Sequence, residues 1–414
     1  MDFDIMGSNA KAAERILGVA DTNLKNKALE AMAAALIANT DSIIAANAID
    51  LEQGQKNGMT DSLLDRLRLT SQRIEGMADG IRQVAALADP IGEIIEGSVR
   101  PNGMKIHKVR VPLGVVGIIF EARPNVTSDA AALCLKSGNT CILRGGKEAI
   151  NSNTAISEVL RGAIASVGLP ADCVQLVTDT SRESANQMMR MNKYLDVLIP
   201  RGGAGLIKAV VENSTVPVIE TGVGNCHVYV DKSADIDMAA NIIFNAKTSR
   251  PSVCNAIETI LVHKDIAAEA LPAIKAKLDS KNVEIRGCAR TAEILGDSVV
   301  PATENDYAIE FLDYILACKV VDSIDGAIEH ISKYSTGHSE CIVTSDYSCA
   351  GKFTSMVDSA AVYVNCSTRF TDGGEFGLGA EIGISTQKLH ARGPMGIRQL
   401  TSSKFIIQGD GQIR

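Results

Sequence analysis

VPLGVVGIIFEARPNVTSDAAALCLKSGNTCILRGG, residues 111–146, is the stretch that decides the fold. An apolar run at 111–120 is followed by a helical segment at 128–137 and by a second apolar run at 140–145 that ends in glycine. Short apolar runs that alternate with helical segments are typical of right-handed βαβ crossovers around a parallel sheet. Because the first run contains Pro112, Gly114 and Gly117 and is too short to cross a bilayer, we expect a buried strand there.

Other patterns lie on the N-terminal side of this stretch and at the end of the chain. Apolar residues recur at three- and four-residue spacing over residues 9–85, which predicts helices. After a turn at 101–103, the polar–apolar alternation at 105–110 predicts an exposed hairpin. The run at 402–411 is expected to form a strand that pairs outside its own domain.

Toward the C-terminus the alternation predicts two α/β sets. The first set adds predicted helices at 152–167 and 184–191, and predicted strands at 173–177, 196–203 and 216–222. The second set has predicted helices at 239–246, 266–279, 324–331 and 349–357, and predicted strands at 256–263, 283–287, 315–321, 340–345 and 360–366.

Composition limits the class of protein. A chain of 414 residues with 46% hydrophobic and 22% charged residues fits a soluble globular protein of two or three domains. The net charge of −8 argues against nucleic acid as the main partner. The first ten residues, MDFDIMGSNA, start acidic and lack an apolar segment, so we expect no signal peptide, no membrane association and a cytoplasmic location.

The ten cysteines are expected to be thiols, because a reducing cytoplasm disfavours disulfides. No C-x-x-C pair occurs, and the closest spacings, Cys134/Cys141 and Cys341/Cys349, are too wide for a zinc site, so we expect no metal. Cys254 lies in SRPSVCNAIE, shortly before an apolar run at 257–262. Taken alone, it is either a small core residue or a nucleophile.

Glycine clusters suggest where phosphate groups could bind. Gly222-x-Gly224 and Gly377-x-Gly379 do not fit the dinucleotide fingerprint and are as well explained by turns. The segments 144–147 (RGGK) and 201–205 (RGGAG) follow predicted strands, and the second opens a helix. Backbone N–H groups at such junctions bind phosphate, although simple turns remain the alternative.

The order of these motifs along the chain resembles that of the aldehyde dehydrogenase superfamily. Arg123-Pro124-Asn125, the Glu-Thr-Gly-x-Gly segment at 220–224, Cys254 and the Phe-Gly-Leu-Gly segment at 376–379 carry the resemblance. It implies an α/β fold with a Rossmann-variant cofactor domain, an α/β catalytic domain and a small β oligomerisation flap. We expect the NADP-binding domain at 1–219, with flap strands at about 100–111, the catalytic domain at 220–390, and a C-terminal segment at 391–414 that returns to the cofactor domain and flap.

Three further segments resemble the superfamily members that reduce an acyl phosphate of glutamate. These are LRGGKEA at 143–149, the segment 320–342 with His338-Ser339-Glu340, and the segment 375–404. The resemblance implies NADPH-dependent reduction of L-glutamyl 5-phosphate to L-glutamate 5-semialdehyde and phosphate through a cysteine thioester, the second step of proline biosynthesis from glutamate. The alternatives are a CoA-acylating aldehyde dehydrogenase, a cysteine acyltransferase without redox chemistry, and a protein without catalysis.

The resemblance also implies roles for individual residues. Cys254 is the expected nucleophile, Asn125 with the Cys254 N–H the oxyanion hole, and Glu220 a catalytic residue whose role stays open. The expected cofactor-binding residues are Arg144, Gly145, Lys147, Gly202, Gly203 and Glu310; for Glu310 the alternative is a solvent-facing helix residue. The expected substrate-binding residues are Arg250, His338, Arg392 and Arg398, since the substrate carries a phosphate and a carboxylate. The implied partners are a second copy of the chain, forming a homo-oligomer, and glutamate 5-kinase, from which the substrate could be channelled.

Overall fold

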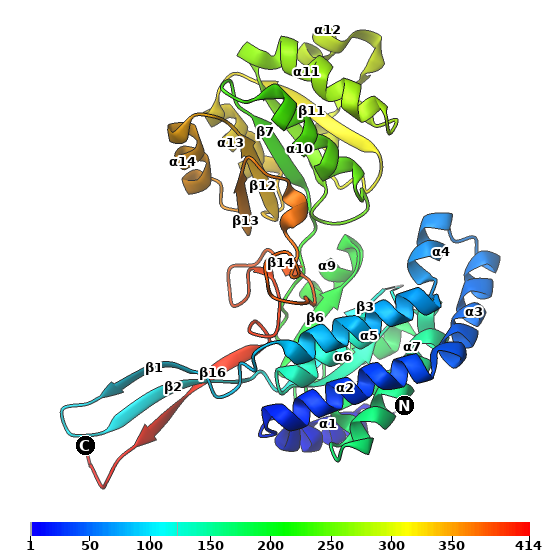
Figure 1. The fold of residues 1–414 in the computed structure, drawn as a ribbon, viewed down its shortest axis with the longest axis vertical. Helices are drawn as coiled ribbons and strands as arrows, with labels where there is room; N and C mark the ends of the chain where they lie inside the picture. The colour runs from blue at the N-terminus through cyan, green and yellow to red at the C-terminus, as the bar shows by residue number, and fades with distance from the viewer. Residues whose placement is uncertain (1, 122) are drawn as a thin grey trace. The chain divides into compact units, whose positions relative to one another are not determined.

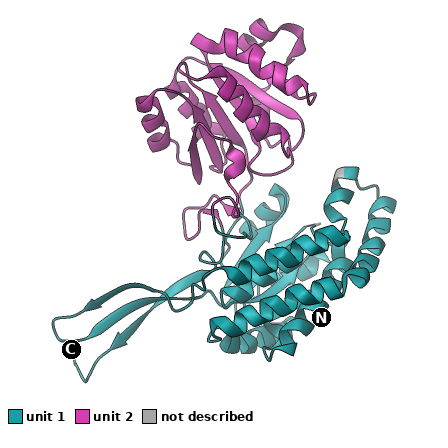
Figure 2. Cartoon of the chain, in the orientation of Figure 1, with its two compact units in different colours: residues 1–221, 377–383, 395–414 teal, residues 222–376, 384–394 magenta. Residues whose placement is uncertain are grey.

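The chain folds into two compact units. The structure is a computed structural model and describes residues 2–121 and 123–414. Unit 1 comprises residues 1–221, 377–383 and 395–414, and unit 2 comprises residues 222–376 and 384–394 (Figure 2). The assignment of cofactor binding to the first and catalysis to the second stays a prediction.

Unit 1 begins with a series of helices, as the spacing over residues 9–85 predicts. They are α1 (Phe3–Leu17), α2 (Thr22–Ala38), α3 (Thr40–Lys56), α4 (Asp61–Leu67) and α5 (Ser71–Ala86). Asp2, Asp21, Thr60 and Thr70 cap four of them by accepting hydrogen bonds from first-turn amides. In the described part of the chain, no single helix is long and apolar enough to cross a membrane. Only α2 and α3 taken together have the length and the apolar composition of a membrane span, and the two helices are bent by 68° where they meet.

A four-stranded parallel sheet forms the centre of unit 1 (Figure 1). Its order is β5 (Val174–Leu176), β4 (Thr140–Arg144), β3 (Val115–Phe120) and β6 (Val197–Arg201). The connecting helices are α6 (Asn125–Lys136), α7 (Ile150–Ser166) and α8 (Arg182–Met189), and α9 (Ala204–Asn213) follows β6. The chain order reverses between β3 and β6, and parallel sheets bind ligands at the carboxyl ends of strands at such a switch point.

The run at 111–120 is divided between two strands and does not form the single strand that was predicted. The run at 111–120 was expected to be a single buried strand, but Pro112 ends β2 (Lys105–Pro112) and β3 begins only at Val115. Gly114 makes the break: its φ of +125° is favourable only for glycine, and a Cβ there would lie 2.1 Å from Asp196 Oδ2. All six residues of β3 are buried, as predicted for this part of the run.

The predicted strand at 216–222 is wrong. Only an isolated bridge between Leu198 and Val218 forms there. Pro217 has no N–H group to donate, so a regular ladder cannot continue through it. The strand that does follow is β7 (Cys226–Val230), which the sequence analysis missed.

Unit 2 contains a seven-stranded sheet in which every pairing is parallel. The order is β10 (Val300–Pro301), β9 (Glu284–Gly287), β11 (Ile315–Val321), β8 (Ile257–His263), β7, β12 (Ser339–Val343) and β13 (Ala361–Val364). Its helices are α10 (Ile236–Thr248), α11 (Lys264–Asp279), α12 (Ala289–Leu295), α13 (Ile324–Tyr334) and α14 (Tyr347–Met356). Apart from β7, β10 and the short α12, the strands of this sheet and its helices correspond to the helices and strands that the sequence predicts between residues 239 and 366.

A three-stranded antiparallel sheet extends from the rest of unit 1 (Figures 1 and 2). Its central strand, β2, pairs with β1 (Ile94–Val99) on one side and with β16 (Thr401–Gln408) on the other. The predicted hairpin and the predicted late strand are therefore both present. We call this sheet the flap.

Candidate active site

Cys254 lies on the segment 249–256, which connects the end of α10 to the start of β8 in unit 2. All ten cysteines lie in the described part of the chain and are thiols, as predicted. Six are buried, whereas Cys254, Cys288, Cys349 and Cys366 are partly exposed. A partly exposed thiol on a loop is better suited to nucleophilic chemistry than a buried core thiol.

The loop at Gly224 packs directly against the backbone of Cys254. A Cβ on Gly224 would lie 1.5 Å from the carbonyl oxygen of Cys254, which only glycine avoids. Cys226, two residues later, donates from Sγ to the same carbonyl oxygen at 3.2 Å. Burial raises the pKa of Cys226 well above its ordinary value, so it remains a protonated donor. The position of the Cys254 peptide is thus fixed from one side by the start of β7.

Glu310 contacts the same loop. Its carboxylate accepts a hydrogen bond from the Gly224 N–H at 2.6 Å. It lies in an irregular segment after the 3₁₀ turn Glu304–Tyr307, and not on a helix, so the alternative of a solvent-facing helix residue does not hold. Burial raises the pKa of Glu310, and the Gly224 hydrogen bond opposes that shift. A carboxylate therefore stands beside the loop that contacts the thiol-bearing peptide.

His338 and Arg250 are two further predicted residues of unit 2. His338 is fully buried at the start of β12; its Nδ1 is 2.8 Å from Ser339 Oγ and 3.7 Å from Cys226 Sγ. Arg250 is exposed on the Cys254 segment itself. His338 thus lies just before β12, and Arg250 and Cys254 lie just before β8.

Arg369 is a neighbour of Cys254 that sequence reasoning missed. Its Nε donates to Ser249 Oγ at 3.0 Å and a second guanidinium nitrogen donates to Asn255 Oδ1, so it contacts both ends of the Cys254 segment. Burial and the nearby Arg250 lower the pKa of Arg369. Nothing in the sequence around it, CSTRFTDGG, distinguishes this arginine, because its contacts are 114 and 120 residues away along the chain.

Asn125 begins α6 in unit 1, at the carboxyl end of β3. Its Nδ2 donates to Asp129 Oδ2 at 2.9 Å, one helical turn further on. Burial raises the pKa of Asp129 to about 6, against the lowering effects of Asn125 and Arg201. Sequence reasoning did not single out Asp129, although the i, i+4 spacing from Asn125 was a usable signal.

The carboxyl ends of β3, β4 and β6 bring together most predicted cofactor residues. Glu121 accepts a hydrogen bond from Gly203 N at 2.8 Å, so a carboxylate already occupies the N-terminus of α9. A Cβ on Gly202 would lie 2.6 Å from that carboxylate. Gly145 is buried after β4, and Lys147 is exposed beside it.

Arg144 shows how a dinucleotide would fit this edge. One guanidinium nitrogen donates to the carbonyls of Thr180 and Ser181, both at 2.9 Å. Its Nε is buried and finds no hydrogen-bond acceptor among the described residues. This donor, the exposed Gly202 and Gly203 before α9, and the topological switch point together fit a nucleotide with phosphate groups.

The remaining predicted residues are Glu220, Arg392 and Arg398. Glu220 is half-buried in unit 1, near the end of its first segment. Arg392 donates to the carboxylate and the carbonyl of Asp358 in unit 2, at 2.8 and 2.7 Å. Arg398 donates to both carboxylate oxygens of Glu93 in unit 1, at 3.0 and 2.7 Å. Both arginines are therefore held by acidic partners.

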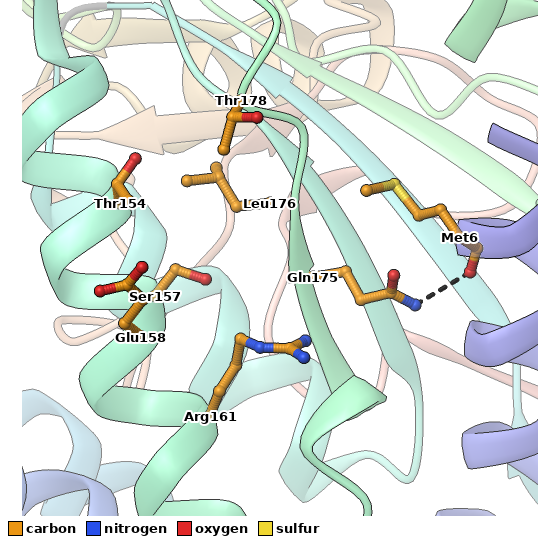
Figure 3. A pocket seen from close by; sticks show the side chains of 8 residues that line it. All are labelled: Met6, Thr154, Ser157, Glu158, Arg161, Gln175, Leu176 and Thr178. Atoms are coloured by element: carbon orange, nitrogen blue, oxygen red, sulfur yellow. Dashed lines mark hydrogen bonds between the residues drawn. The ribbon is translucent and has the colours of Figure 1, made fainter. Parts of the chain in front are cut away.

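Unit 1 also has a polar pocket of about 240 Å³ beside β5 (Figure 3). Its lining residues are Met6, Thr154, Ser157, Glu158, Arg161, Gln175, Leu176 and Thr178. Gln175 Nε2 donates to the carbonyl of Met6 at 2.9 Å, which links β5 to α1. The pocket shares no lining residue with the switch point. No cluster of three or more metal-ligating side chains occurs within the described ranges 2–121 and 123–414.

Comparison with known proteins identifies the family. The model of the aldehyde dehydrogenase family matches residues 1–291. The chain therefore belongs to the aldehyde dehydrogenase family, and the predicted fold class is confirmed. Membership implies a nicotinamide cofactor.

Similar proteins over the full length narrow this further. The chain is 61% identical over 407 residues to a gamma-glutamyl phosphate reductase of Clostridium novyi, covering 98% of this chain and 97% of the relative. It is 62% identical over 413 residues to one of Heliobacterium modesticaldum, covering 100% and 99%. A crystal structure of the Thermotoga maritima gamma-glutamyl phosphate reductase matches with a TM-score of 0.96 and 52% identity, over 99% of each chain. Within its family, the chain belongs with the gamma-glutamyl phosphate reductases.

Proposed function

We propose that this chain reduces L-glutamyl 5-phosphate to L-glutamate 5-semialdehyde and phosphate with NADPH, the second step of proline biosynthesis from glutamate. The relatives that match its whole length carry this reductase activity in their names. The observation that carries the chemistry is the partly exposed Cys254 thiol, on a peptide anchored by Gly224 and Cys226.

Cys254 is the proposed nucleophile. Its thiolate Sγ attacks the acyl carbon, the C–S bond forms, and the C–O bond to phosphate breaks with both electrons leaving on phosphate. NADPH, when bound, supplies the hydride that reduces the thioester. The resulting oxyanion then expels the Cys254 thiolate and leaves the aldehyde, so the enzyme returns to its starting state.

Asn125 Nδ2 and the Cys254 backbone N–H are the proposed donors to the oxyanion. Asp129 accepts one Nδ2 hydrogen of Asn125, which fixes the orientation of the amide and leaves the second hydrogen for the oxyanion. Glu220 is proposed to modulate the Cys254 thiol, to assist proton transfer or to orient the cofactor and its loop. It has no water to activate here, because phosphate rather than hydroxide exchanges with the thioester.

Cofactor binding is proposed at the switch point of unit 1. Gly145, Gly202 and Gly203 would present backbone to the phosphate groups, and Arg144 and Lys147 would supply positive charge for a 2′-phosphate. Glu310 is proposed to hold the nicotinamide ribose.

Substrate binding is proposed for the cations around Cys254. Arg250 and His338 are candidates, and Arg369 joins them because it contacts both ends of the Cys254 segment. Arg392 and Arg398 stay candidates, although each is held by a carboxylate.

A homo-oligomer formed through the flap is also proposed. Its exposed apolar residues support this: Ile94, Ile95, Val99, Phe405, Ile406 and Ile407. We further propose a cytoplasmic location and delivery of the labile acyl phosphate by channelling from glutamate 5-kinase.

The reaction run in reverse tests the function. Purified protein is mixed with glutamate 5-semialdehyde, phosphate and NADP⁺, and NADPH formation is followed; NAD⁺ replaces NADP⁺ in a parallel series. Phosphate-dependent reduction that is lost in Cys254→Ser and kept in Cys349→Ser, another partly exposed thiol, is expected. Activity that needs CoA instead of phosphate would support the acylating alternative. Full activity in Cys254→Ser would reject the thioester mechanism.

A further inference from the structure

A buried ion pair joins the two ends of the Cys254 segment. Lys247 lies in the last turn of α10 and Glu258 is the second residue of β8, so the pair brackets residues 249–256. Lys247 Nζ is 2.6 Å from Glu258 Oε2, and the two side chains are 0% and 1% exposed. The segment that carries the nucleophile is therefore closed at its base by a salt bridge shielded from water.

The other oxygen of Glu258 reaches the segment that carries Glu310. Leu312 N donates to Glu258 Oε1 at 3.3 Å. Leu312 has a φ of +56°, a conformation that is costly for a residue with a side chain and persists only where the surroundings impose it. The ring centroid of Phe311, the residue before it, lies 6.0 Å from Lys247 Nζ and 5.1 Å from the central carbon of the Arg286 guanidinium group. Two consecutive residues, Phe311 and Leu312, thus contact this pair.

A closed set of contacts follows from these bonds. Glu258 holds Leu312, Glu310 holds the Gly224 N–H at 2.6 Å, and Gly224 packs on the Cys254 carbonyl. The Cys254 segment returns to Glu258 through the start of β8. The nucleophile and the proposed ribose-binding carboxylate therefore share one anchor.

Stability alone does not account for this pair. Burial raises the pKa of Glu258 to about 7 and lowers the pKa of Lys247, so both groups are held against their tendency to become neutral. Apolar residues of similar volume often stabilise a protein as well as a buried ion pair does. What the pair provides that apolar residues cannot is directional bonding to two separate segments.

We propose that Lys247 and Glu258 are positioning residues that set the place of Cys254 and of Glu310 relative to each other. This rests on the proposed function, because it assigns Cys254 as nucleophile and Glu310 as a cofactor ligand. The Lys247–Glu258 bond holds the base of the nucleophile segment, and the Glu258–Leu312 bond holds the cofactor side. Neither side chain needs to touch substrate.

Two double variants separate the two bonds. Lys247→Met/Glu258→Leu removes both charges and the acceptor for Leu312. Lys247→Met/Glu258→Gln removes the ion pair but keeps an oxygen that can accept from Leu312 N. The matched control is Lys25→Met/Asp89→Asn, which removes the buried Lys25–Asp89 pair of unit 1, 2.5 Å apart and 1% and 8% exposed. Steady-state kinetics, NADPH affinity by fluorescence and thermal unfolding are measured for each.

The Leu variant is expected to keep the unfolding temperature of the control variant while kcat falls ~10- to 100-fold, since small displacements of a nucleophile have effects of that size. Its KM for NADPH should rise ~5-fold or more, the size of effect expected when binding loses a typical hydrogen bond. In the Gln variant the KM for NADPH should return to within ~2-fold of wild type, while kcat stays low, because only the Leu312 bond is restored.

The outcomes that would contradict the positioning role differ from those that would contradict the proposed function. If wild-type protein shows no phosphate-dependent reduction, or Cys254→Ser keeps it, the proposed function is rejected. If wild type is active and Cys254→Ser is not, wild-type kcat and KM in the Leu variant overturn the positioning role. A loss of kcat that only follows loss of folded protein overturns it too, and an NADPH KM equal in the Gln and Leu variants overturns the link to Glu310.

Discussion

Gly224 and Cys254, thirty residues apart, are in direct backbone contact: a Cβ on Gly224 would lie 1.5 Å from the Cys254 carbonyl oxygen and 2.6 Å from its Cα. No side-chain rearrangement relieves such a clash, because both atoms belong to the main chain. Gly224→Ala must therefore displace the Cys254 peptide. We expect kcat to fall ~100-fold, since misplacement of a reacting group by about 1 Å has that effect.

The control for this variant is Gly351→Ala in α14 of the same unit. A Cβ there meets nothing within 4 Å, and alanine favours a helix interior over glycine by about 1 kcal/mol. Gly351→Ala should keep full activity and unfold at the same or a higher temperature. Equal kcat in Gly224→Ala and wild type would show that the Cys254 peptide tolerates a shift.

Most helices and strands could be predicted from the sequence because apolar periodicity is a local property. The apolar run at 115–120 and the polar–apolar alternation at 105–110 each predict a strand from only six residues. The error at 216–222 arose because β-branched residues around Pro217 imitate a strand that proline cannot complete. β7 was missed because Asn225 and His227, on either side of its first residue, carry polar side chains, although all five residues of β7 are buried.

The candidate site was less accessible to sequence reasoning for a different reason. Cys254, Asn125 and Glu310 could be proposed through their motifs, but Arg369, Asp129 and the Lys247–Glu258 pair act on those residues through contacts. Arg369 is 114 residues from the Asn255 it binds. Contacts between residues so far apart along the chain form only in the folded structure, so the periodicity and the motif spacing of the sequence do not predict them.

Asp129 should give the reaction a pH dependence near 6. Burial raises its pKa from 3.8 to about 6. Above that pH the Asp129 carboxylate accepts a hydrogen bond from Asn125 Nδ2 and orients the Asn125 amide, whereas below that pH the protonated Asp129 side chain no longer requires the amide to point this way. We expect kcat/KM to fall as the pH drops through about 6. Asp129→Asn keeps an acceptor oxygen without a titration, so its pH profile should lack this step while activity at pH 8 stays within ~3-fold of wild type, as for loss of about one modest hydrogen bond.

The raised pKa of Asp129 also determines how its contribution to the free energy of unfolding changes with pH. Since the pKa of Asp129 is higher in the folded chain than in the unfolded chain, its contribution to the free energy of unfolding is present below pH 3.8 and is lost as the pH rises through about 6. Denaturant unfolding of wild type and Asp129→Asn at pH 4 and pH 7 measures this. An equal stability difference at both pH values would contradict the raised pKa.

The flap should decide the oligomeric state. Phe405 and Ile407 are 61% and 60% exposed and lie two residues apart on β16, hence on one face of the sheet. Phe405→Asp/Ile407→Asp places two charges on that face, which should dissociate the proposed oligomer in light scattering after gel filtration. Val19→Asp, at a site 84% exposed outside the flap, is the control and should leave the mass unchanged. A wild-type monomer would reject the proposal outright.

Glu310 should affect the cofactor and the nucleophile together. Glu310→Ala leaves the Gly224 N–H without its acceptor and removes the proposed ribose ligand, so KM for NADPH should rise and kcat should fall, each ~10-fold or more, as for loss of a charged hydrogen-bond partner. Glu310→Gln keeps an oxygen for Gly224 and should recover most of kcat, while NADPH affinity recovers only partly because the charge is gone. Kinetics with NADPH varied at saturating substrate separate the two parameters. If both variants change KM alone, the hydrogen bond to Gly224 has no part in placing Cys254, and the contact that joins the two loops serves cofactor binding only.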